Sequence, residues 1–189
     1  MPLAALIDNE PRYELIDGQK IVMSPAGTNH QSIQLNLSLI LGNFLRKKRC
    51  KLFLEHKVVF DNGFWLQPDL LIVCDRDKIK RTQIDGAPDF IAEILSPATE
   101  LRDIGIKKDT YEKYGVKEYW IIDPGKKSVT VYLLTDGRYK ADNVYRVFSP
   151  EEWEELTAEE QAEQKLTLKL SLYDELTIDI NDIFEDLCY

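Results

Sequence analysis

The chain has 189 residues, of which 44% are hydrophobic and 30% charged, an ordinary globular composition that excludes collagen-like and disordered proteins. Its formal net charge is −9, and residues 151–189, with 13 acidic and 2 basic side chains, carry −11 of it. No apolar run reaches the ~18 residues that span a bilayer, and the N-terminus lacks a basic start followed by an apolar stretch, so we expect a cytoplasmic protein with no membrane partner.

Apolar periodicity and turn residues predict the elements in chain order. We expect a hairpin over 13–22, a helix from after Gly27 to about Arg49, strands over 51–60, 69–74 and 89–95, a helix over about 101–114 that Gly115 ends, strands over 118–123 and 128–135, an acidic helix capped by Ser149, a strand over 172–180 and a short terminal helical segment. This order predicts the class α/β (α+β), a central sheet flanked by two main helices. The length suits a single domain over 1–189, decorated by the acidic segment 150–189.

The charge is distributed unevenly along the chain. Residues 1–150 carry 22 basic and 20 acidic side chains, a net charge of +2. The low pI therefore reflects the C-terminal fifth of the chain, and it does not exclude binding of a polyanion by residues 1–150. The densest positive patch is RKKRCK at 46–51. Two compatible interpretations account for this patch. The cations stabilise the C-terminal end of a helix by interacting with its dipole, or they contact nucleic acid.

The three cysteines, Cys50, Cys74 and Cys188, are far apart in the sequence and form no C-x-x-C pair. An odd number of scattered cysteines in a cytoplasmic protein predicts reduced thiols. With only two histidines and no paired cysteines, a zinc site is not expected.

Carboxylates beside buried strands are the candidate metal ligands. Asp69 opens the apolar run 69–74 directly after Pro68, and Glu93 lies among apolar residues within 89–95. A carboxylate in such surroundings is costly unless it is paired or bound to a metal. On adjacent strands the two would lie about 5 Å apart, close enough to share one hard cation such as Mg²⁺. Spacing alone leaves open a strand-start cap for Asp69 and a salt-bridged core acid for Glu93.

A second Pro-Asp pair offers a competitor to Asp69. Asp89 precedes Glu93 by four residues on one strand, and residues so spaced lie about 13 Å apart, too far to chelate one ion. Asp89 is therefore interpreted as a turn residue, and Asp69 as the partner of Glu93.

The helix that follows Glu93 supplies a cation. Lys107 and Lys108 both fall within its apolar stripe, and periodicity does not choose between them. A lysine on an inward face either snorkels to solvent or meets an acid. The residues of the stripe are Leu101, Ile104, Tyr111 and Tyr114.

Three segments carry a family resemblance. PDLLIV (68–73), IAEILSPATELRDIGIKKDTYEKYGVKEYWIIDP (91–124) and YELIDGQKIVMSPAGTNH (13–30) resemble the bacterial Uma-two family of restriction endonuclease-like proteins. The resemblance extends over about 12–147 and includes the final LTIDINDIF, so it covers most of the chain. It implies the PD-(D/E)XK nuclease fold, a central mixed sheet with helices on both sides and metal carboxylates on adjacent strands.

The resemblance also assigns residues. It makes Asp69 and Glu93 the two metal carboxylates. Leu95 stands where well-known members of the wider superfamily have lysine, and the pattern S-P-x-T-x-x-x-D-x-G-x-K-x-x-x-Y places that lysine at Lys107 instead. Asp103 and Tyr111 then lie one helical turn on either side of Lys107, on roughly the same face.

The function implied is that of a Mg²⁺- or Mn²⁺-dependent endonuclease, with DNA as the expected nucleic acid. Asp69 and Glu93 would hold the ion, and Lys107 would orient a water or stabilise charge on phosphate. Glu55 is either an additional metal ligand or half of a cross-strand salt bridge. His30, near the start of the first helix, either caps it or contacts phosphate, or is a plain surface histidine.

The alternative function is a catalytically inactive nuclease-like interaction module, because a fold does not guarantee its usual activity. In such a module the acidic stretch 151–164 would repel DNA, mimic it, or bind a protein partner through Trp153 and Leu156. The other interpretation of this stretch is a solvated surface helix. A homodimer would suit the cutting of two strands, although no coiled-coil heptad supports it.

Overall fold

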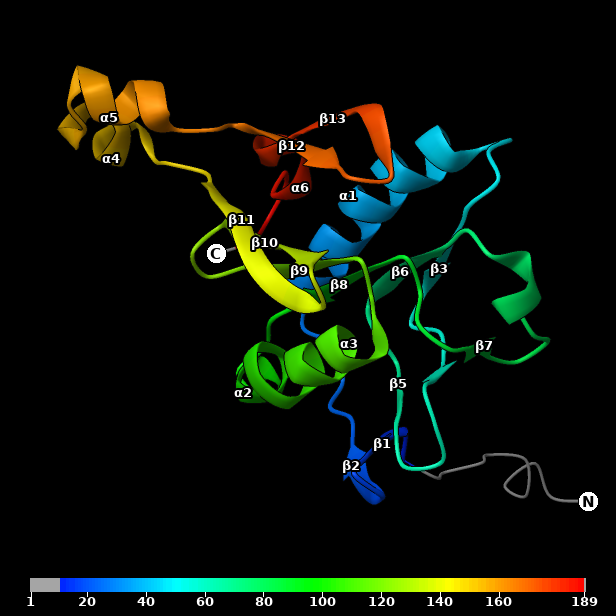
Figure 1. Ribbon diagram of the computed structural model, residues 1–189. Helices are drawn as coiled ribbons and strands as arrows, with labels where there is room; N and C mark the ends of the chain where they lie inside the picture. Colours follow the sequence, from blue (N-terminus) through cyan, green and yellow to red (C-terminus); the bar gives the residue numbers. More distant parts are fainter. Residues whose placement is uncertain (1–10, 189) are drawn as a thin grey trace, which may run out of the picture.

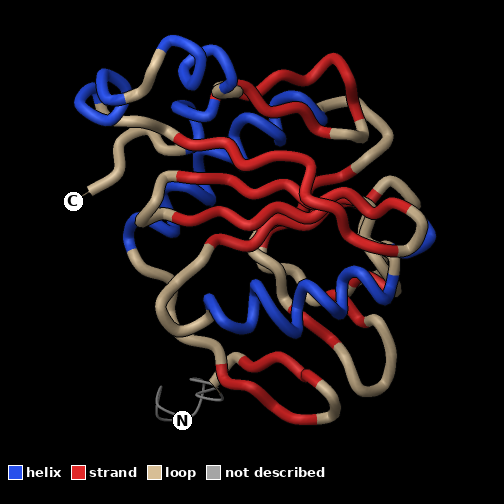
Figure 2. Tube along the Cα trace, turned by 60° about the vertical axis from the view of Figure 1, so that its left-hand side comes forward, coloured by secondary structure: helices blue, strands red, loops and turns tan. Residues whose placement is uncertain are grey.

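The computed structural model describes residues 11–188 and is built around a six-stranded mixed sheet (Figure 1). The strand order is β11-β10-β9-β8-β6-β3, in which β8 and β9 pair in parallel and the other neighbours are antiparallel. Helices lie on both sides of this sheet, as Figure 2 shows, so the predicted mixed class is confirmed. The strands are β3 (Lys51–Leu54), β6 (Leu70–Val73), β8 (Phe90–Ile94), β9 (Glu118–Asp123), β10 (Ser128–Thr135) and β11 (Arg138–Arg146).

A smaller sheet carries the N-terminal hairpin, in the order β2-β1-β5-β4-β7. The predicted hairpin is confirmed, and its turn residues Asp17 and Gly18 have φ values of 50° and 75°, as a two-residue hairpin turn requires. The strands are β1 (Tyr13–Ile16), β2 (Gln19–Val22), β4 (Val58–Val59), β5 (Trp65–Leu66) and β7 (Ile84–Asp85).

The central strands are buried on both faces. Along β6, Leu70 and Ile72 pack into the core beneath α1 (Thr28–Leu45), whereas Leu71 and Val73 pack into a second core on the opposite face. This alternation follows from the two-residue period of a strand, and it explains why β6 is a continuous apolar run. No helix in the described part of the chain is both long and apolar enough to cross a bilayer.

The predicted strand over 51–60 is wrong in extent. The strand ends at Leu54, because the backbone changes direction at Glu55, whose φ is 44°. As a result β3 belongs to the large sheet and β4 belongs to the small one. The first helix also ends earlier than expected, at Leu45, and the basic cluster 46–51 continues past it through Lys47, whose φ is 67°.

The predicted helix over 101–114 contains a π-helical turn, Asp103–Lys107, between α2 (Glu100–Arg102) and α3 (Lys108–Tyr114). A π turn holds more residues than an α turn and therefore shifts the face that points inward. The expected stripe is accordingly wrong in its first half, because Leu101 is 84% exposed and Ile104 44% exposed. Gly115 ends the helix with φ 85°, as predicted.

The C-terminal segment forms a second hairpin near α1 (Figure 1). Glu118 of β9 connects this hairpin to the main sheet. The buried Glu118 carboxylate accepts bonds from Trp120 Nε1 and from the backbone N–H and hydroxyl of Ser171. The elements are β12 (Thr167–Leu170), which the sequence did not predict, β13 (Tyr173–Asp179) and α6 (Ile180–Ile183).

The acidic stretch is two short helices instead of the single one expected. Ser149 caps α4 (Pro150–Glu155) and Thr157 caps α5 (Ala158–Glu163), each through a complete capping box. Both project at one edge of the molecule in Figure 1. A 3₁₀ turn, η2 (Arg76–Lys78), completes the described elements.

The expectation of reduced thiols is wrong for two of the three cysteines, because Cys50 and Cys74 form a disulfide. The antiparallel register of β3 with β6, which pairs Lys51 with Val73, places the two cysteines opposite each other. Their separation of 24 residues gives no sign of this proximity in the sequence. Cys188 is free and exposed.

We expect one reactive thiol per unfolded chain when the protein is purified without reductant, and three after reduction. Titration with a chromogenic disulfide in denaturant, before and after reduction, measures this directly. Three thiols before reduction would contradict the Cys50–Cys74 bond.

Candidate active site

Asp69 and Glu93 face each other across two neighbouring strands. In the β6–β8 pair Leu70 lies opposite Ala92, and the same antiparallel register continued by one residue sets Asp69 opposite Glu93. Both residues line one cavity of about 350 Å³, together with Glu14, His30, Glu55 and Lys107. The structure therefore brings together the two carboxylates that the sequence singled out.

Asp69 is held by two donors on one oxygen. The backbone N–H of Ile94 donates to Asp69 Oδ2 at 2.7 Å, and His30 Nε2 lies 3.1 Å from the same atom. Burial works to lower the pKa of His30, but the hydrogen bond and charge of Asp69 outweigh it and raise that pKa. Gln34, one turn after His30 on α1, donates to the Asp69 carbonyl at 3.0 Å. The first two turns of α1 thus orient the start of β6.

Two of the three roles considered for His30, the helix cap and the plain surface histidine, are wrong, whereas contact with phosphate stays a prediction. Helix α1 has no side-chain cap, and the imidazole is mostly buried against Asp69 instead of lying free at the surface. A signal was present in the sequence, because His30 and Gln34 are four residues apart and so share one face of the helix.

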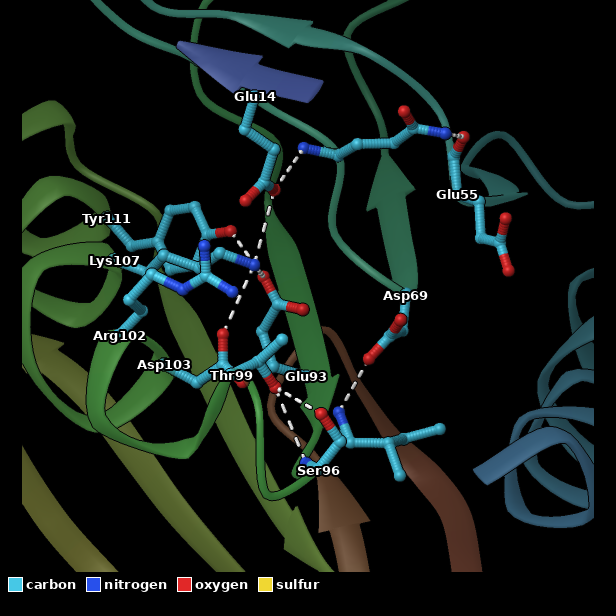
Figure 3. A network of polar contacts seen from close by, with 12 residues as sticks. Glu14, Glu55, Asp69, Glu93, Ser96, Thr99, Arg102, Asp103, Lys107 and Tyr111 are labelled. Carbon is cyan, nitrogen blue, oxygen red and sulfur yellow. Dashed lines mark hydrogen bonds and ion pairs between the residues drawn. The ribbon is translucent and has the colours of Figure 1, made fainter. Parts of the chain in front are cut away.

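Glu93 is buried and bonded to the helix that follows it. Its Oε1 accepts from the Tyr111 hydroxyl at 2.6 Å and from Lys107 Nζ at 3.1 Å (Figure 3). Burial raises the pKa of Glu93 well above its usual value, against the pull of the Lys107 charge. Burial also raises the pKa of Asp103, which Lys107 likewise opposes.

Lys107 is the centre of the polar cluster. Its Nζ lies 3.1 Å from Glu93 Oε1, 3.1 Å from Asp103 Oδ1 and 3.2 Å from Glu14 Oε1, and each of these side chains is at most 5% exposed. Burial works to lower the pKa of Lys107, but the surrounding carboxylates raise it well above its usual value. The ammonium is therefore charged at neutral pH. Lys108 instead lies over the Tyr132 ring.

The sequence did not single out Glu14, which comes from the N-terminal hairpin. It lies on β1, where burial alternates along the strand, and Glu14 and Ile16 share the buried face. That alternation was readable in YELI, but nothing in the sequence placed this face against Lys107.

The remaining predicted residues lie in different surroundings. Glu55 lines the same cavity, but its carboxylate pairs with Arg12 at 2.7 Å and lies apart from Glu93 in Figure 3. Asp89 accepts the Cys74 N–H at 2.8 Å and pairs with Lys117 at 2.7 Å, in keeping with a structural role.

The donor set fits a hard divalent ion that keeps part of its water. Asp69 Oδ1 and Glu93 Oε2 accept no hydrogen bond from the described residues, and carboxylate oxygens are the ligands that Mg²⁺ prefers. Among residues 11–188 no group of three His, Cys, Asp or Glu side chains is arranged to hold a metal. An ion held by Asp69 and Glu93 would take its remaining ligands from water, from substrate or from a further side chain.

A sequence model of the Uma2 family, described as "Putative restriction endonuclease", matches residues 2–179. The chain belongs to this family. The Uma2 chain is similar to "Uncharacterized protein slr1290" of Synechocystis, with 28% identity over 129 residues that cover 66% of this chain and 67% of that protein.

A solved structure shows the same fold. It is that of "a putative nuclease belonging to DUF820" from Anabaena variabilis, with a TM-score of 0.70 and 24% identity over 96% of this chain and 94% of that one. The resemblance inferred from the sequence is thus confirmed for the family, and the fold is restriction endonuclease-like.

Replacing Lys107 by methionine is expected to lower the free energy of unfolding by about 3–5 kcal/mol at neutral pH, because three buried carboxylates lose their cation. The loss should be smaller at pH 5 than at pH 8, because carboxylates whose folded pKa is raised take up protons as the pH falls. Urea unfolding at both pH values measures this. Lys108→Met is the matched control, and an equal loss in both variants would contradict the assignment.

Proposed function

We propose that this Uma2 protein is a Mg²⁺- or Mn²⁺-dependent endonuclease that hydrolyses phosphodiester bonds of nucleic acid, with DNA as the substrate. The observation that carries the proposal is the facing pair of Asp69 and Glu93, with the Lys107 ammonium held against Glu93 in the same cavity. Membership of a family described as "Putative restriction endonuclease" supports this reaction class.

Asp69 and Glu93 would hold the divalent ion through the two oxygens, Asp69 Oδ1 and Glu93 Oε2, that accept no hydrogen bond from residues 11–188. When bound, such an ion polarises a phosphate oxygen and lowers the pKa of a coordinated water. Ile94 N–H and His30 keep the Asp69 carboxylate in one orientation, and Tyr111 does the same for Glu93. These bonds pre-organise both ligands before substrate arrives.

Lys107 would act on the substrate. Its raised pKa keeps the ammonium protonated, so it can donate to a phosphate oxygen as negative charge develops there. Arg12 and Arg102 also line the cavity, and the Arg12 side chain is 56% exposed. Cations at this position would contact phosphates that flank the scissile bond.

Cleavage of supercoiled plasmid DNA with Mg²⁺ or Mn²⁺ tests the proposal. Asp69→Asn, Glu93→Gln and Lys107→Met should each lower the cleavage rate by about 100-fold or more, because each removes a ligand or a charge-stabilising donor. Asp89→Asn is the matched control from the second Pro-Asp pair and should cleave like wild type. Circular dichroism confirms that each variant is folded. Full activity in folded Asp69→Asn and Glu93→Gln would overturn the assignment.

Metal binding can be measured without cleavage. Calorimetric titration with Mn²⁺ should show one site in the wild type that is lost in Asp69→Asn and in Glu93→Gln. Glu55→Gln should weaken binding only if Glu55 is an additional ligand. A wild type that binds neither Mn²⁺ nor DNA at low salt would favour the alternative, a nuclease-like interaction module.

A further inference from the structure

The proposed reaction uses neither Asp103 nor Glu14, and of these two carboxylates Glu14 is the one that comes from outside the helical segment of Lys107. It belongs to β1 of the small sheet, and its side chain is 3% exposed. Its Oε1 accepts the backbone N–H of Gln67 at 2.9 Å and lies 3.2 Å from Lys107 Nζ (Figure 3). One carboxylate oxygen therefore joins the N-terminal hairpin, the segment that leads into Asp69, and the lysine.

The three contacts of Lys107 are not equivalent. An ammonium has three donors, and here three carboxylates lie at nearly equal distances of 3.1–3.2 Å. Asp103 is four residues away on the same helical segment and moves with Lys107. Glu93 is the proposed metal ligand, so its charge is shared with the ion. Glu14 is the contact that ties Lys107 to another part of the protein without using a proposed ligand.

The bond to Gln67 makes this contact specific. Gln67 lies two residues before Asp69, and its backbone N–H donates to the Glu14 carboxylate, which is thereby held beside the start of β6. Glu14 therefore fixes the position of the ammonium relative to the strand that carries Asp69. If Glu93 binds a divalent ion, its attraction for Lys107 is weakened, whereas the ion pair between Glu14 and Lys107 would remain.

We propose that Glu14 is a positioning residue of the nuclease site, which holds the Lys107 ammonium in register with Asp69 and Glu93; this inference rests on the proposed function. Glu14 does not bind the metal and does not touch the substrate. Its removal leaves the ligands in place but lets the ammonium move away from the phosphate.

Glu14→Gln is the direct test, because glutamine has nearly the same shape and its carbonyl still accepts the Gln67 N–H. We expect kcat for DNA cleavage to fall by about 10- to 100-fold, with KM and Mn²⁺ affinity within about twofold of wild type. Glu154→Gln, on the exposed face of α4, is the matched control and should leave all three unchanged. Loss of Mn²⁺ affinity in Glu14→Gln would overturn the proposal by making Glu14 a ligand, and an unchanged kcat would overturn it as well.

A double-mutant cycle of urea unfolding tests the contact independently of cleavage. Glu14→Gln should lower the urea midpoint in the wild-type background, and should leave it unchanged or raise it in the Lys107→Met background, where Glu14 is an unpaired buried charge. Lys107→Gln replaces Lys107→Met if the latter does not fold. Additive effects would contradict the inference. A wild type that does not cleave DNA would contradict the proposed function alone, because the cycle still decides whether Glu14 holds Lys107.

Discussion

The arrangement of the site depends on one buried ammonium surrounded by carboxylates. Lys107 lies 3.1–3.2 Å from Glu93, Asp103 and Glu14, and each of these four side chains is at most 5% exposed. None of these carboxylates could be buried cheaply as an ion without this cation, and Lys107 could not be buried without them. The cluster therefore joins β8, the helical segment after it and the N-terminal hairpin through a single group. Its carboxylates still outnumber its cation, which favours a further positive ion nearby.

The sheet determines where this cluster can lie. Because the central strands are buried on both faces, side chains of β8 alternate between two apolar cores, and Glu93 shares the face of Ile91. The antiparallel register with β6 then sets Asp69 opposite Glu93 at the point where β6 begins. The backbone N–H of Ile94 and the imidazole of His30 both bond to Asp69 Oδ2, which fixes the orientation of the Asp69 carboxylate. Two carboxylates on neighbouring strands are thus a direct product of strand geometry.

The sequence predicted those parts of the site that depend on strand period and local spacing. Asp69 and Glu93 could be recognised as polar residues beside apolar strands, and Asp89 could be set aside by distance along one strand. Periodicity could not choose Lys107 over Lys108, and the family resemblance made that choice. The π turn at Asp103–Lys107 explains the difficulty, since it shifts the inward face away from Leu101 and Ile104.

Contacts between distant segments could not be predicted. Glu14 reaches Lys107 only because the small sheet folds beside β8, and Cys50 meets Cys74 only through the β3–β6 register. The break at Glu55 likewise depends on where the chain changes direction. These three features are set by tertiary packing, which overrides the local pattern. The second cap at Thr157 is different, because Thr157 and Glu160 form a capping box whose residue pattern is local and could be read from the sequence.

We propose that Asp69, Glu93 and Lys107 converge on one metal and phosphate site. The decisive experiment is a crystal structure grown with Mn²⁺ and a non-cleavable DNA duplex, with anomalous diffraction recorded for manganese. We expect an anomalous peak between Asp69 Oδ1 and Glu93 Oε2, with the Lys107 ammonium directed at the adjacent phosphate. An ion bound elsewhere, or a phosphate that lies away from Lys107, would contradict it.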